Sequence, residues 1–129
     1  MFYELSTLRE ELTAELRDAR IIGYASSRTH ASEPLALAAM ALHGQGESEA
    51  AQRCSDALAV CQDDEGKVGV RSREAPYWPT ALAALLWAAR GEKKSRRKRA
   101  VEWLMHARGE PIVADPDIVG HQTSLIAWP

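Results

Sequence analysis

The acidic pair in Asp115-Pro116-Asp117 comes nearest, within this sequence, to a metal-dependent site. Two carboxylates in close sequence could hold Mg²⁺ and, through the ion, a pyrophosphate group. Acids and prolines also favour solvated turns, and a turn ahead of a helix is the alternative interpretation here. The four histidines show no metal-ligand spacing. We therefore predict neither a metal site nor another cofactor.

A basic cluster is the second arrangement with chemical potential. It occupies residues 90–99 and contains Arg96, Arg97, Lys98 and Arg99. Such a cluster could bind an anion such as a phospholipid headgroup or RNA. No aromatic residue is interleaved with these charges, so a solvated helix start is the alternative and nucleic acid is not expected as a partner.

Three segments of the chain repeat one pattern, in which a polar loop leads into a short, apolar, Ala-rich helix. They begin at Ser32, Tyr77 and His121, which gives a period of about 45 residues. Such a period is typical of stacked helical hairpins. We therefore predict an all-α domain over residues 1–129, with repeats at roughly 1–44, 45–91 and 92–129.

Two kinds of helix follow from the apolar pattern. Nearly unbroken apolar runs predict buried inner helices over 34–42 and 79–89, and a third is expected to begin near His121. Apolar residues at three- and four-residue spacing predict amphipathic helices over 5–19, 47–61 and 95–107, each with one face packed on the rest. The total is a stack of about six helices.

Polar and aromatic residues at the starts of the inner helices are the candidates for lining a ligand cavity. They are Glu33, Tyr77, Trp78, His121 and Gln122. Aromatic side chains could contact an isoprenoid or its cationic form through their ring faces. Packing between the helix layers is the alternative for the aromatic residues, and support of the helix start is the alternative for Glu33.

Composition limits the other classes of function. The formal net charge is -2 and 46% of residues are hydrophobic, so no global field draws the chain to polyanions. The N-terminus lacks the features of a secretory signal, and no apolar run is long enough to span a bilayer. Cys54 and Cys61 are too far apart on one helix for a local disulfide. We expect a cytoplasmic protein, and a location at a membrane surface stays open.

Two parts of the sequence resemble repeats of the terpenoid cyclase and protein prenyltransferase superfamily. In the first, a predicted outer helix ends in Val60-Cys61-Gln62, and a turn with Gly66 leads into Trp78-Pro79-Thr80. The second comprises 99–104 and 117–129. The resemblance implies a partial α/α toroid of squalene-cyclase-like prenyltransferase repeats. It covers about residues 30–129.

The same resemblance implies chemistry only where the family's catalytic residues are present. No Asp-x-Asp-Asp cluster precedes an inner helix, and neither cysteine follows the family's Asp-x-Cys zinc pattern. Whether this chain alone catalyses a reaction therefore stays open, and no residue is assigned as the catalytic acid. The first functional hypothesis is an apolar, isoprenoid-binding concavity with incomplete catalytic residues, and the alternative is a non-enzymatic helical protein-interaction module. A partial ring also predicts either self-association or a missing C-terminal half.

Overall fold

A computed structural model describes residues 2–24 and 28–109, and these form five helices without a strand. The helices are α1 (Phe2–Asp18), α2 (Ser32–Gly44), α3 (Ser48–Val60), α4 (Pro79–Ala89) and α5 (Lys94–His106). The all-α prediction is confirmed for this part of the chain. The sixth helix expected near His121 lies outside the described residues, as do Gln122 and the Asp115–Asp117 pair.

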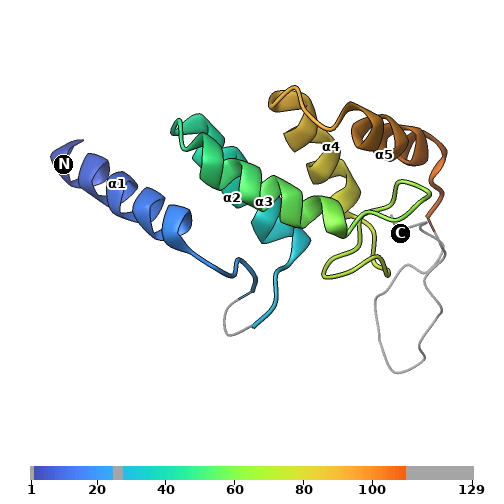
Figure 1. Cartoon of the computed structure of the whole chain (residues 1–129), viewed down its shortest axis with the longest axis horizontal. Helices are drawn as coiled ribbons and strands as arrows, with labels where there is room; N and C mark the ends of the chain where they lie inside the picture. The colour runs from blue at the N-terminus through green and yellow to red at the C-terminus, as the bar shows by residue number, and fades with distance from the viewer. Residues whose placement is uncertain (1, 25–27, 110–129) are drawn as a thin grey trace, which may run out of the picture.

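The helices pair as two hairpins. α2 packs along α3, and α4 packs along α5, while α2 and α4 also contact each other (Figure 1). α2 and α4 are rich in alanine, whose small side chain lets helix backbones approach closely. The large side chains at the centre are fully buried and include Leu35, Leu42, Leu58, Leu86 and Trp87.

α1 packs on the rest through part of the apolar face that the sequence predicts. Its last turn is anchored, because Leu16 packs against the buried core. Leu5, Leu8 and Leu12 are instead about half exposed. The leucine spacing correctly predicted a helix, but its apolar face is only partly covered and lines a shallow hollow with Ala41 of α2 and with Gln45 at the end of that helix.

The loop between α3 and α4 ties the two hairpins together at the starts of the inner helices. At α2, the backbone N–H of Ser32 donates to the carbonyl of Val70 at 2.7 Å. At α4, the Thr80 hydroxyl oxygen accepts from the N–H of Val68 at 2.8 Å. The loop thus holds both inner helices in register through buried hydrogen bonds.

Candidate ligand-binding site

Two hollows lie along α3, where the segment after α1 passes beneath it. The first hollow has a volume of about 520 Å³ and the second of about 540 Å³. His30 and Ala57 line both, so the two hollows adjoin. Volumes of this size suit a small organic ligand.

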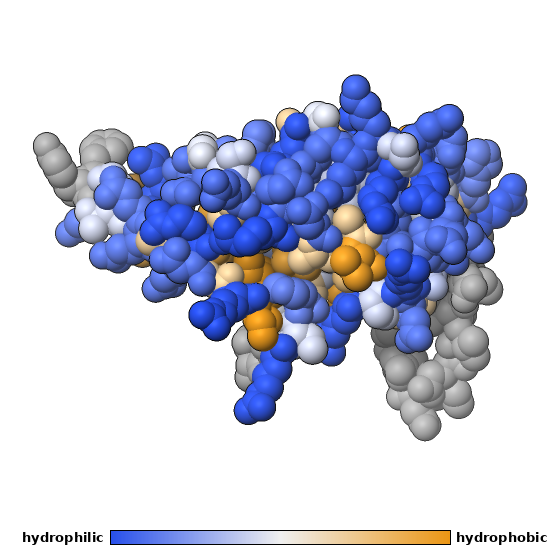
Figure 2. Space-filling model, in the orientation of Figure 1, coloured by the Kyte–Doolittle hydropathy of each residue, from blue (hydrophilic) through white to orange (hydrophobic). Residues whose placement is uncertain are grey.

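The floor of the hollows is apolar. α1 and the segment that follows contribute Leu16, Ala19, Ile21 and Ile22, and α3 contributes the surface around Ala57. Figure 2 shows this apolar surface as an orange patch along the lower side of α3, surrounded by hydrophilic residues. An alkyl or isoprenoid chain that packs on this floor would remove apolar surface of both the ligand and the protein from water, which favours binding.

Five arginines surround this floor. Arg17, Arg20 and Arg53 line the first hollow, and Arg28 and Arg71 line the second. Asp18 is the one acidic residue among the lining residues of either hollow. The rim therefore carries an excess of positive charge even though the whole chain is slightly acidic.

The rim arginines differ in how they are already engaged. Arg17 pairs with Asp18 at 3.1 Å and with Glu47 at 3.2 Å. Arg53 donates to the carbonyl oxygen of Arg17 at 2.6 Å, which satisfies a backbone acceptor at the end of α1. Arg20, Arg28 and Arg71 have no acidic partner among the described residues. Arg71 also lies over the Tyr24 ring, with its guanidinium carbon 5.9 Å from the ring centre. All three guanidinium groups keep N–H donors that can pair with an anionic ligand.

His30 adds a polar group between the two hollows. Its Nδ1 accepts a hydrogen bond from the backbone N–H of Ile22 at 3.1 Å. An accepting Nδ1 leaves the hydrogen of the neutral ring on Nε2, so the ring offers one further donor. The histidine is half-buried.

The two cysteines also face the hollows. Cys54 lines the first hollow and Cys61 lines the second, and both are free thiols. Burial raises the pKa of the Cys54 thiol, although the charges of Arg53 and Arg90 oppose this effect. The thiol therefore stays protonated at neutral pH and is a poor nucleophile.

The ligand-cavity candidates from the sequence lie elsewhere. Glu33 accepts a hydrogen bond from the Tyr24 hydroxyl at 2.7 Å, and this bond raises the pKa of Tyr24. Tyr77 packs edge-on against Trp103, with ring centroids 6.0 Å apart. Trp78, at the start of α4, is 39% exposed. None of these three lines the hollows, and His121 and Gln122 are outside the described residues.

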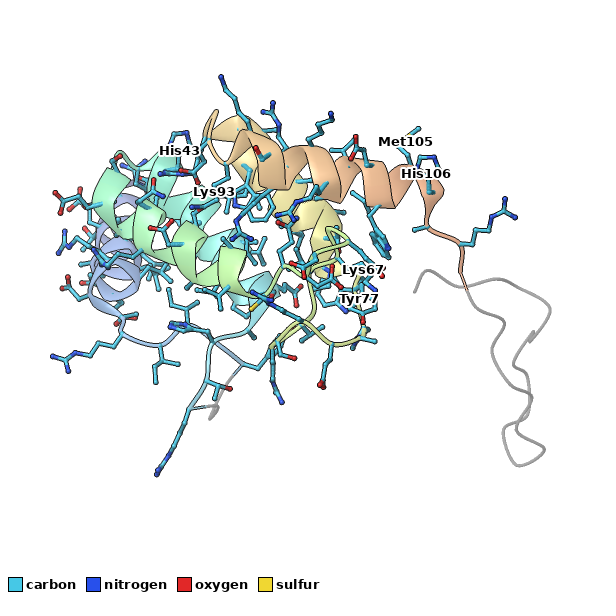
Figure 3. All side chains as sticks on the ribbon, turned by 45° about the vertical axis from the view of Figure 1, so that its right-hand side comes forward. His43, Lys67, Tyr77, Lys93, Met105 and His106 are labelled. Atoms are coloured by element: carbon cyan, nitrogen blue, oxygen red, sulfur yellow. The ribbon has the colours of Figure 1, made fainter. Side chains whose placement is uncertain are left out.

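Tyr77 has a second neighbour that bears on its role. The ammonium group of Lys67 lies 4.8 Å from the centre of the Tyr77 ring, and Figure 3 shows the two side chains together at the loop before α4. One face of the ring thus meets a cation of the protein itself. Tyr77 therefore packs against other protein side chains, which is the alternative interpretation of the aromatic residues in the sequence.

Several residues of the basic cluster on α5 form contacts within the protein. Arg96 donates to the carbonyl oxygen of Ala59 at 3.0 Å, at the end of α3. Arg99 reaches the carbonyl oxygen of Asp64 at 3.5 Å, and Lys98 pairs with Glu102 at 3.7 Å. The Arg97 side chain forms no ion pair with another described residue. Part of the cluster therefore joins α5 to the first hairpin, and these side chains are less available to a ligand.

The rim arginines were missed in the sequence because they do not form a cluster there. They come from α1, the segment after it, α3 and the loop before α4. The available signal was the predominance of arginine among the basic residues, which does not indicate where in the fold the arginines lie.

Other chemistry and other proteins give no further lead. Within residues 2–24 and 28–109, no group of three or more His, Cys, Asp or Glu side chains is placed to hold a metal ion. No helix in this part of the chain has the length and apolarity needed to cross a membrane.

Comparison with known proteins finds no matching family model, no matching curated protein and no matching solved structure.

Proposed function

We propose that this chain is a helical-hairpin repeat protein that binds an amphiphilic anion of the isoprenoid diphosphate class in the hollows along α3. The observation that carries the proposal is the combination of an apolar floor with a rim on which Arg20, Arg28 and Arg71 lack acidic partners among the described residues. Guanidinium groups pair well with phosphate oxygens. The resemblance of the sequence to squalene-cyclase-like repeats favours an isoprenoid as the apolar part.

Binding, rather than catalysis, is what these residues support. Protonating an alkene needs a carboxylic acid that is kept protonated by burial or by a neighbouring like charge. Asp18 lines the first hollow, but it is exposed and already pairs with Arg17. No side chain in the hollows therefore meets the requirement for a cyclase acid.

The test is calorimetric titration of the full chain with farnesyl diphosphate, and its components are the controls. Farnesol supplies the tail without the charge, and inorganic pyrophosphate supplies the charge without the tail. We expect farnesyl diphosphate to bind at least about tenfold more tightly than either component, because both parts of the site contribute. Hexadecyl phosphate tests whether a lipid of a different kind serves equally well.

Two substitutions locate the site. Ala57→Leu adds a bulky side chain to the floor shared by both hollows, and Arg20→Gln with Arg71→Gln removes two rim charges. Both variants should weaken binding of farnesyl diphosphate. Ala88→Leu is the matched control, since Ala88 is an exposed helical alanine on α4 that lines neither hollow. If Ala57→Leu leaves the affinity for farnesyl diphosphate unchanged, or if the chain does not bind farnesyl diphosphate at all, the proposal is contradicted. The protein-interaction module then becomes the functional hypothesis.

A further inference from the structure

Two apolar faces on different helices are only partly covered by the described residues. One is the face of α1 that carries Leu5, Leu8 and Leu12, which are about half exposed and line a shallow hollow beside Ala41 of α2. The other is on α5, where Val101 is 45% and Met105 77% exposed. Figure 1 shows α1 and α5 at opposite ends of the helix stack. A contact between these faces cannot therefore form within one chain.

One edge of the α1 face carries acidic residues, whereas Arg9 lies with its leucines at the other edge. Glu4, Glu11 and Glu15 follow the same helical spacing as the leucines, and Glu4 and Glu11 line a shallow hollow with Leu8. All three are exposed and form no ion pair with another described residue. Their negative charge is therefore available to a partner.

The α5 face is bordered by basic residues. Lys94, Lys98, Val101 and Met105 are spaced four, three and four residues apart, which places them on one side of the helix. Lys94 has no ion pair with a described residue, and Lys98 has only a long contact of 3.7 Å to exposed Glu102. Figure 3 shows Met105 projecting from the C-terminal end of α5.

We propose that α1 of one copy of the chain docks antiparallel on α5 of a second copy. In this orientation Leu5 and Leu8 meet Met105 and Val101. The same orientation places Glu11 and Glu15 beside Lys98 and Lys94. Charge complementarity is what selects a second copy as the partner, because the acidic and the basic face belong to the same sequence. The inference goes beyond ligand binding and does not depend on the hollows.

The contact is head-to-tail, which determines how an assembly would grow. Each copy keeps a free α5 face after its α1 has docked, so further copies can add until a ring closes or a filament forms. The ion pairs are solvent-exposed, so salt should weaken the association.

Light scattering on the eluting full chain, over a range of protein and salt concentrations, tests the proposal. We expect species larger than one chain at low salt, and a shift towards the single chain at high salt. Glu11→Lys with Glu15→Lys should weaken association about tenfold, because two attractive contacts become repulsive. Lys94→Glu with Lys98→Glu should do the same.

The decisive variant combines all four substitutions in one chain. It exchanges the charges of the two faces, so association should return towards that of the original protein. Glu49→Lys with Glu74→Lys is the matched control, since both glutamates are exposed and lie on neither face. A single chain under all conditions would overturn the proposal, and so would association that both charge reversals leave unchanged. Circular dichroism verifies that each variant is folded.

Discussion

The side-chain amide of Gln62 donates a hydrogen bond to the backbone carbonyl of Arg96 at 2.9 Å. Its Nε2 donates a second bond to the carbonyl of Gly66 at 3.1 Å, and its Oε1 accepts from the Arg96 guanidinium at 3.3 Å. Gln62 is almost fully buried. One amide therefore joins the end of the first hairpin to the outer helix of the second.

Replacing this glutamine should destabilise the fold. In Gln62→Leu the carbonyls of Gly66 and Arg96 lose a donor, and an unpaired buried polar group costs about 1–3 kcal/mol. Urea unfolding should show this loss in the free energy of unfolding. Gln45→Leu is the control, because Gln45 is exposed at the end of α2 and its change should stay within about 0.5 kcal/mol. Equal effects of the two substitutions would contradict the structural role.

Gly66 should be even less tolerant of change. Its φ of +100° favours glycine, and an added Cβ would lie within 3.0 Å of the backbone of Arg99. Gly66→Ala must therefore push α5 away from the loop, and we expect a lower unfolding temperature. Gly44→Ala is the matched control, since nothing lies within 4 Å of its added Cβ. A helical glycine replaced by alanine should leave stability unchanged or slightly increased.

Local sequence signals predicted the helices well because they depend on nearby residues. A proline at the first helical position marks the start of α4, and α4 spans Pro79–Ala89 as predicted. α2 begins at Ser32, two residues before the predicted start. The cause is non-local, since the backbone N–H of Ser32 finds its acceptor in Val70 of a distant loop.

The candidate site was less predictable, for a related reason. Residues such as Arg20, Arg53 and Arg71 line two adjoining hollows only because α3 and two loops come together in the fold. Periodicity reports which side of a helix is apolar, but not whether another element covers it. The leucines of α1 illustrate this point, because the same spacing would occur on a fully buried face.

The thiols provide a test of burial that needs no ligand. Cys54 and Cys61 are both buried, and burial raises the pKa of the Cys54 thiol. Because the thiolate is the reactive form, modification by a disulfide reagent at pH 8 should be slow in the folded protein and fast in urea. The Cys61→Ser variant isolates the reaction of Cys54. Rapid reaction of that variant in the folded state would contradict the burial of Cys54.

Acid should weaken the contact between the two hairpins, because two carboxylates there are stabilised in their charged form. A hydrogen bond from Lys93 lowers the pKa of Asp56 despite some burial. At Glu92, burial alone would raise the pKa, but hydrogen bonds from Ser55 and Arg90 outweigh it and the pKa is lowered. A carboxyl whose pKa is lowered by folding stabilises the fold above its unfolded value, which is about 4. This contribution is lost as the pH falls through the lower, folded value.

Urea unfolding between pH 7 and pH 3 should therefore show stability falling on the acid side, with part of the slope due to Glu92. The Glu92→Gln variant removes a group that titrates differently in the folded and unfolded states. It should be less stable than the original protein at pH 7 and should lose less stability on acidification. Glu49→Gln is the matched control, because Glu49 is exposed and has no ion pair within the described residues. If both variants follow the pH profile of the original protein, the hydrogen bonds from Ser55 and Arg90 do not stabilise the Glu92 carboxylate, and the two hairpins are held together by apolar contacts and Gln62.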